Sequence, residues 1–243
     1  MIENYKYKFI RFLTWLNIIN YCTFITIDFF NKSNLWRCSN LLKYIGILIC
    51  FIITLLIGED KYDSLDKNLV RIALLFTIIA DFNFLIINNY VLGILFFCLV
   101  QFTYIIRHNR GKNIKTYNYF FILMIYIILF LLLNYINLFH DNNFIISISL
   151  VYGLILIHSL IISLGTFKRK FFSKKTCILI ILGLILFLFC DVNVALYNID
   201  DYLVLKYNGF ENISNSLIWI FYLPSQIFLS LSGYNNVNKI FRR

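Results

Sequence analysis

The sequence predicts an all-α membrane protein, a polytopic bundle of about eight transmembrane helices in a single domain over residues 1–243. The chain is 60% hydrophobic and only 14% charged, whereas a soluble domain carries about 25% charged residues. Its apolar residues come in blocks of about 16–23, close to the roughly 20 that a helix needs to cross the hydrocarbon core. Because the blocks lack long alternation of apolar and polar residues, the pattern argues against a membrane β-barrel.

The apolar blocks predict eight spans in chain order, of which the fourth and eighth are short. They cover residues 9–30, 41–57, 69–88, 91–106, 117–139, 144–165, 176–197 and 217–232. Basic residues precede the first span, as they do in a signal peptide. That span is too long for a signal peptide and lacks a small-residue cleavage site, so we expect it to be a retained helix. The longest connection, 198–216, leaves little room for a soluble domain.

The basic residues predict how the bundle is oriented. Four clusters of Lys and Arg, at the N-terminus, within 107–115, within 168–175 and within 239–243, fall on one side when eight spans are counted. Basic loops are retained in the cytoplasm, so both termini are expected there. A count of seven spans would split the clusters between the two sides. The net charge of +10 therefore indicates orientation, and we expect no nucleic-acid partner.

Two acidic residues lie deep inside the predicted spans, Asp81 in the third and Asp191 in the seventh. A carboxylate at the middle of a membrane helix costs about 2.5–3.5 kcal/mol on insertion scales. The helical rise places Asp81 roughly 18 Å and Asp191 roughly 22 Å from the cytoplasmic start of their spans. Because both spans run in the same direction, the two carboxyls are expected at one level, facing one cavity in the bundle.

Other polar side chains are expected near this level. Lys43 enters from the outer end of the second span, and Gln101 lies at mid-depth in the fourth. Tyr222 and Gln226 are four residues apart, on one face of the eighth span. One lysine and two acids make a set that can pair inside a membrane. In a purely structural interpretation, each Asp only pairs with a Lys or caps a packing defect.

The remaining reactive residues predict no cofactor and no metal site. The three histidines are scattered without metal-ligand spacing. The six cysteines form no CxxC pair and are interpreted as small packing residues. Four asparagines within the spans are expected to form interhelical hydrogen bonds. These are Asn17, Asn20, Asn134 and Asn137.

Together, the motifs of the predicted spans two to eight resemble the lysoplasmalogenase family, the YhhN-like integral membrane proteins. The positions that match the family's short signatures are Lys43, Asp81, Gly93, Phe97, Tyr104, Tyr152, Gly183, Phe187, Asp191, Ala195, Tyr222 and Gln226. The chain departs from those signatures at four positions. Tyr44 replaces a proline, Ala80 a glycine, Gln101 a histidine and Cys190 a serine.

The resemblance implies hydrolysis of the vinyl-ether bond of lysoplasmalogens to a fatty aldehyde and a glycerophospho-base. It implies a lysophospholipid substrate and an integral protein of the bacterial cytoplasmic membrane. Vinyl-ether cleavage starts with protonation of carbon and passes through an oxocarbenium ion, which glycosidases also stabilise with two carboxyls. We therefore expect Asp81 and Asp191 to be catalytic, one protonated in its apolar surroundings and the other ionised beside polar groups such as Lys43. The sequence does not assign these two roles.

The polar residues around the two acids are expected to bind the substrate or to orient substrate and water. They are Lys43, Gln101, Tyr104, Tyr152, Tyr222 and Gln226.

Two alternative functions stay open at this point. Intramembrane acids also form proton relays, so the chain is alternatively a proton- or ion-coupled transporter of small solutes. Such transporters have paired broken helices, and the chain has a single proline, Pro224. Alternatively, Gln101 in place of the family's histidine indicates a non-catalytic relative that binds lipid. The sequence leaves the head-group preference and the oligomeric state open.

Overall fold

The computed structural model describes residues 2–30, 36–136, 143–203 and 210–241, and all of the regular structure in these ranges is helical. The helices follow one another along the chain without an intervening strand in the described residues. They are α1 (Ile2–Phe30), α2 (Trp36–Leu55), α3 (Ser64–Phe82), the π-helical turn η1 (Asn83–Ile87), α4 (Tyr90–His108), α5 (Thr116–Ile136), α6 (Asn143–Leu164), α7 (Thr166–Arg169), α8 (Lys174–Leu203), α9 (Phe210–Leu231) and α10 (Val237–Phe241).

The predicted all-α membrane bundle is confirmed, and the described part of each predicted span lies almost entirely within one long helix. Seven of these helices are long and apolar enough to cross a membrane, α1 to α6 and α8. The eighth predicted span lies in α9, which is 22 residues long and is not one of those seven. The count of eight transmembrane helices therefore stays a prediction. Residues 137–139, which end the fifth predicted span and include Asn137, lie outside the described residues.

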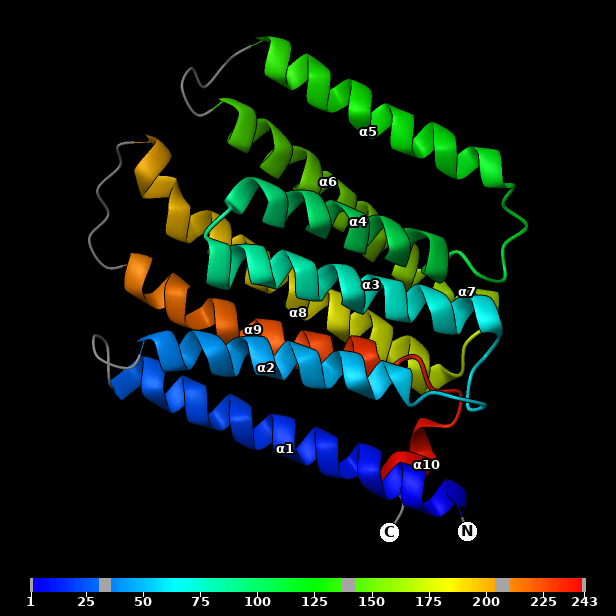
Figure 1. The fold of residues 1–243 in the computed structure, drawn as a ribbon. Helices are drawn as coiled ribbons and strands as arrows, with labels where there is room; N and C mark the ends of the chain where they lie inside the picture. The colour runs from blue at the N-terminus through cyan, green and yellow to red at the C-terminus, as the bar shows by residue number, and fades with distance from the viewer. Residues whose placement is uncertain (1, 31–35, 137–142, 204–209, 242–243) are drawn as a thin grey trace.

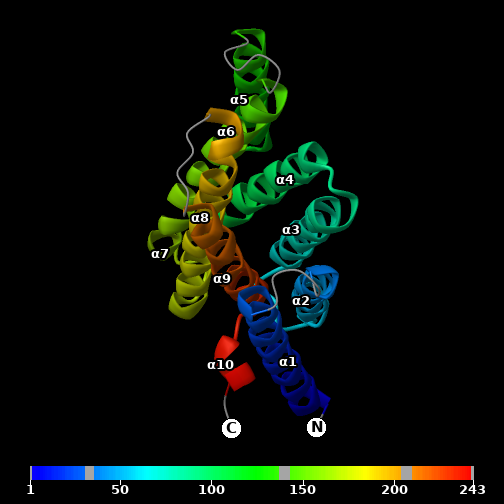
Figure 2. The same ribbon diagram turned by 90° about the vertical axis from the view of Figure 1, so that its left-hand side faces the viewer.

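The long helices lie side by side, with both ends of the described chain at the same end of the bundle (Figure 1). α8 and α9 lie in the middle, whereas α1 and α5 form opposite edges (Figure 2). α5 has no buried residue at all, which suits a helix surrounded by lipid. Asn17 and Asn20 of α1 donate to the Gly46 and Leu42 carbonyls of α2 at 3.0 and 2.8 Å, as predicted for interhelical hydrogen bonds.

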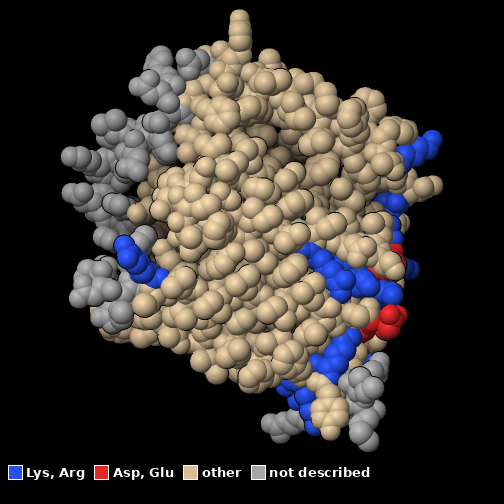
Figure 3. Space-filling view, viewed as in Figure 1, with Lys and Arg blue, Asp and Glu red and all other residues tan. Residues whose placement is uncertain are grey.

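Lys and Arg gather mainly at the end of the bundle where the chain begins and ends (Figure 3). This is the distribution that the sequence predicts for the cytoplasmic side, and the orientation itself stays a prediction. Arg242 and Arg243 of the last basic cluster lie outside the described residues.

Arg107 differs from the prediction, because it is not a loop residue but a fully buried one. α4 continues to His108, one half-turn beyond the predicted end of the span, and this places Arg107 on the inward face of the helix. Its Nε donates to Asp66 Oδ1 of α3 at 2.9 Å, and its Nη1 donates to Ser232 Oγ at 2.7 Å. The guanidinium also lies 5.2 Å from the centre of the Phe172 ring. This ion pair fixes α3, α4 and the end of α9 to one another.

Candidate active site

Asp81 is held on the inward face of α3, where its neighbours at helical spacing are also buried. Its side chain is 3% exposed. The hydroxyl of Tyr222, on α9, lies 2.9 Å from Oδ1 and 2.8 Å from Oδ2 of this carboxyl. Within the described residues, Tyr222 is the one hydrogen-bond partner of the Asp81 carboxyl. The acid is therefore removed from solvent and has little polar compensation.

Asp191 is held by a second tyrosine and is less enclosed. It lies on α8 and is half-buried, and it accepts a hydrogen bond from the hydroxyl of Tyr152 on α6. Cys190, at the family's serine position, precedes Asp191 in the chain and is buried. Each of the two acids is thus positioned by a tyrosine from another helix, but only Asp191 is partly open to its surroundings.

Aromatic rings join the two acid–tyrosine pairs into one site. The Phe97 ring of α4 lies 6.0 Å from the Tyr152 ring and 6.2 Å from the Tyr222 ring, centre to centre. Phe187 of α8 lies 5.6 Å from Phe97 and 5.7 Å from Tyr222. The Phe97 ring therefore lies between the tyrosine that holds Asp81 and the tyrosine that holds Asp191. Five helices, α3, α4, α6, α8 and α9, therefore bring Asp81 and Asp191 into one aromatic-walled site.

The chain changes its helical geometry directly after Asp81. η1 begins at Asn83, whose side-chain amide donates to the Ile79 carbonyl at 2.7 Å. The turn ends at Asn88 with a positive φ of 59°. π-helical turns are rare and often mark functional sites. The turn returns the chain into α4, and this sets Phe97 beside the two acids.

Gly93 lets this connection close tightly. A Cβ at position 93 would lie 2.5 Å from the ring of Phe84 in η1. The same Phe84 ring stacks on Phe97 with a centroid distance of 5.5 Å. A side chain at position 93 would displace Phe84 and, through it, the ring between the two tyrosines.

Lys43 does not join the two acids, and that expectation is wrong. Its Nζ pairs with Asp28 Oδ2 of α1 at 2.9 Å, and Asp28 also accepts from the Ser39 hydroxyl at 2.5 Å. The sequence reasoning missed Asp28, although it lies near the end of the first span as Lys43 lies near the start of the second. Lys43 nevertheless lies beside the site. Its ammonium is 4.7 Å from the Trp219 ring, whose centre is 5.4 Å from that of Tyr222.

Gln101, Tyr104 and Gln226 are fully buried in the bundle. The amide atoms of both glutamines and the Tyr104 hydroxyl have no hydrogen-bond partner among the residues that the structure describes. They lie on α4 and α9, the helices that supply Phe97 and Tyr222.

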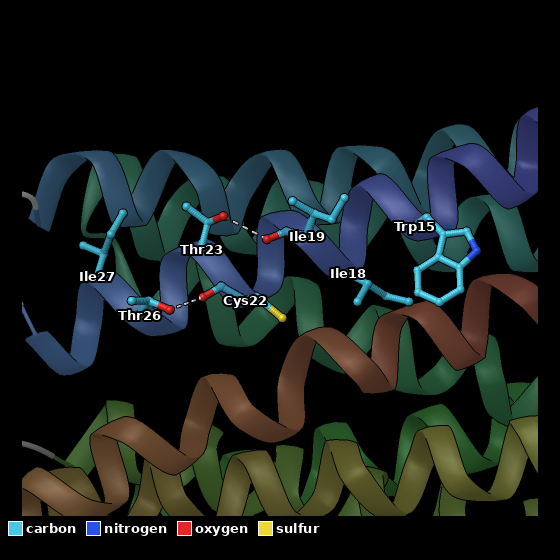
Figure 4. A pocket seen from close by; sticks show the side chains of 7 residues that line it. All are labelled: Trp15, Ile18, Ile19, Cys22, Thr23, Thr26 and Ile27. Atoms are coloured by element: carbon cyan, nitrogen blue, oxygen red, sulfur yellow. Dashed lines mark hydrogen bonds between the residues drawn. The ribbon is translucent and has the colours of Figure 1, made fainter.

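A shallow apolar hollow on α1 is separate from this site (Figure 4). The hydroxyls of Thr23 and Thr26 in it donate to carbonyls of their own helix at 2.9 and 2.7 Å. Both threonine hydroxyls of the hollow are therefore engaged by the backbone of α1 itself. Its lining residues are Trp15, Ile18, Ile19, Cys22, Thr23, Thr26 and Ile27.

No cluster of three or more His, Cys, Asp or Glu that suits a metal ion occurs within the described ranges.

Comparison with known proteins connects this site to a family. The family model described as the YhhN family matches residues 39–233, which includes Asp81, Asp191 and both tyrosines that hold them. Comparisons with curated proteins and with solved structures gave no match. The matched range covers most of the chain, and it contains every helix of the acid site. The chain therefore belongs to the YhhN family, which is the lysoplasmalogenase family.

Proposed function

We propose that this protein hydrolyses the vinyl-ether bond of lysoplasmalogens, releasing a fatty aldehyde and a glycerophospho-base. The observation that carries the proposal is the meeting of Asp81 and Asp191, from separate helices, in one aromatic-walled site with a tyrosine bonded to each. Vinyl-ether hydrolysis needs a proton donor and a nearby negative charge to stabilise an oxocarbenium ion. Two carboxyls in unequal surroundings supply both.

The surroundings suggest which acid carries the proton. Asp81 is buried with one tyrosine donor, and an ionised carboxylate is costly in such a place. Asp191 is half-buried and receives a hydrogen bond from Tyr152. Asp81 is therefore the general acid in this proposal, and Asp191 is the carboxylate that stabilises the cation and activates water.

The proposed steps return both acids to their starting states. Asp81 gives its proton to the outer alkene carbon, and the double bond shifts to form the oxocarbenium ion. Water attacks that ion at its carbon while Asp191 takes the proton of the water, which yields a hemiacetal. The hemiacetal then collapses. Asp191 protonates the departing glycerol oxygen, Asp81 takes the proton of the hemiacetal hydroxyl, and the aldehyde is released.

The other polar residues of the site orient the substrate in this proposal. Tyr152 and Tyr222 hold the carboxyls, while Phe97 and Phe187 form an apolar wall against which a single alkyl chain packs. Lys43 is paired with Asp28, and its ammonium lies against the Trp219 ring at the edge of the site. In this proposal its positive charge lies near the lipid phosphate. The substrate reaches the site from the surrounding membrane, which we take to be a bacterial cytoplasmic membrane.

A panel of matched lysolipids tests the reaction. Purified protein in vesicles is given vinyl-ether, alkyl-ether and acyl lysolipids that share one head group, and aldehyde and free fatty acid are measured. Aldehyde is expected from the vinyl ether alone, because the alkyl ether has no alkene carbon to protonate and the ester needs a different attack. Fatty acid from the ester, or lipid binding without any turnover, would contradict the proposed reaction. Counterflow of a small solute without lipid turnover would favour a transporter instead.

Replacing Tyr222 with Phe tests how the acid is held. The variant removes the hydroxyl between the two Asp81 oxygens and leaves the ring packed on Phe97 and Phe187. We expect aldehyde release to fall about tenfold to a hundredfold, because the hydroxyl stabilises the carboxylate that Asp81 becomes as it gives up its proton. A buried hydrogen bond to a charged group contributes about 1.5–3 kcal/mol. The control is Tyr21→Phe. This change removes a partly buried hydroxyl whose partner within the described residues is the Ile220 carbonyl. An unchanged rate in Tyr222→Phe would show that Asp81 does not depend on this hydroxyl.

A further inference from the structure

α4 and α9 run in the same direction (Figure 1), and two side-chain contacts between them define their register. Phe97 of α4 contacts Tyr222 of α9 with ring centres 6.2 Å apart. Further along, Arg107 of α4 donates to the hydroxyl of Ser232, just beyond α9, at 2.7 Å. In both contacts the second residue follows the first by 125 positions. The two helices therefore keep the same register between the Phe97–Tyr222 contact and the Arg107–Ser232 contact.

Gln101 and Gln226 occupy the same register between those two contacts, also 125 positions apart. Each lies four residues along its helix from the Phe97–Tyr222 contact, which is slightly more than one helical turn, or about 6 Å. The constant register therefore sets the two amides in one layer, next to the layer that contains Asp81 and its tyrosine.

The polar atoms of this amide layer are buried and have no hydrogen-bond partners among the described residues. Both glutamines are fully buried, and none of their four side-chain polar atoms has a partner in the described part of the chain. The hydroxyls of Tyr104 and Ser225, close by in sequence on the same two helices, are likewise buried and unpartnered there. Buried amides and hydroxyls are nearly always hydrogen-bonded in proteins, to ordered water where no protein group is in reach.

The chemistry of the layer fits water better than an ion. Its amides and hydroxyls are uncharged and offer both donors and acceptors, as a water molecule requires. The nearest charge along α4 is Arg107, which is fully engaged by Asp66 and Ser232.

We propose that the amides of Gln101 and Gln226 hold a buried water site one helical turn from the Asp81–Tyr222 pair. The site keeps at least one water within hydrogen-bond distance of both amides. It supplies the water that adds to the oxocarbenium ion, and this second part rests on the proposed hydrolysis. The competing arrangement is a dry layer, in which the two side chains rotate and bond directly to each other.

A high-resolution map of the wild-type protein in lipid decides between the two arrangements without any measurement of turnover. We expect a water peak within about 3.0 Å of an amide atom of each glutamine. The double variant Gln101→Met/Gln226→Met should lose the peak, because methionine fills the same volume without a polar partner. A direct amide–amide hydrogen bond with no water peak would overturn the proposal.

Steady-state kinetics test the supply of water separately. In the double methionine variant we expect kcat to fall about tenfold or more with KM unchanged, because the attacking water loses its two amide partners. Thr14→Val is the control, since it removes a buried hydroxyl on α1 that is bonded only to its own helix. A raised KM with unchanged kcat would assign the layer to lipid binding and overturn the supply role. If the wild-type protein released no aldehyde, the hydrolysis would fail and the map would still decide the water site.

Discussion

Replacing Asp81 with Asn is expected to lower aldehyde release by about 10³-fold or more, because the substitution removes the proton donor. Positioned general acids and bases contribute about 10²–10⁴-fold each. Asn has nearly the shape of Asp and keeps an oxygen that accepts from the Tyr222 hydroxyl, so the packing against Phe97 and Phe187 should persist. The measurement is initial aldehyde release by purified variants at saturating vinyl-ether lysolipid.

Asp191→Asn should give a loss of similar size for a different reason, since it removes the negative charge that stabilises the cation and takes the proton of water. Because the two acids act as a unit, Asp81→Asn/Asp191→Asn should be hardly slower than either single variant. Glu59→Gln, an exposed carboxyl away from the site, provides the control and should keep the wild-type rate. Unimpaired release by either Asn variant would end the two-carboxyl mechanism.

The depth of the two acids was predictable from the sequence because depth in a membrane helix follows from counting residues. The rise per residue is fixed, and the bilayer forces the backbone of each span to be helical. Residue counting alone therefore sets Asp81 and Asp191 at one level. In the structure each acid is bonded to a tyrosine from another helix, Asp81 to Tyr222 and Asp191 to Tyr152, and the common depth stays a prediction. The same reasoning predicted the long helices to within a few residues in most places.

The partner of each polar residue was less predictable, because it depends on how each helix is rotated about its axis and on its neighbours. Lys43 had several acids at a reachable depth, and the packing of α1 against α2 gave it Asp28. For Arg107 the error came from the end of the span. A charged residue at that position can be either the first residue of the loop or part of the last turn of the helix. In the structure α4 continues for another half-turn, and Arg107 is therefore buried.

Arg107→Met is expected to destabilise the protein by about 3–5 kcal/mol, the usual result of removing one partner of a buried ion pair. The variant leaves the Asp66 carboxylate without a counter-charge in a place where both side chains are fully buried. It also frees the Ser232 hydroxyl and carbonyl, to which the guanidinium donates at 2.7 and 2.8 Å. Unfolding of purified variants in one detergent or lipid mixture measures the loss.

A matched control lies just outside the same two helices. Arg110, two residues beyond the end of α4, pairs with Asp63, the N-cap of α3, and both side chains are about a third exposed. Ion pairs with that exposure contribute about 0–1 kcal/mol, so Arg110→Met should change stability little. Burial, and not the mere presence of a pair, is therefore what separates the two variants. The double variant Asp66→Leu/Arg107→Met should recover much of the loss, because no unpaired charge remains. A stability close to wild type in Arg107→Met alone would mean that α3, α4 and the end of α9 are held together without this ion pair.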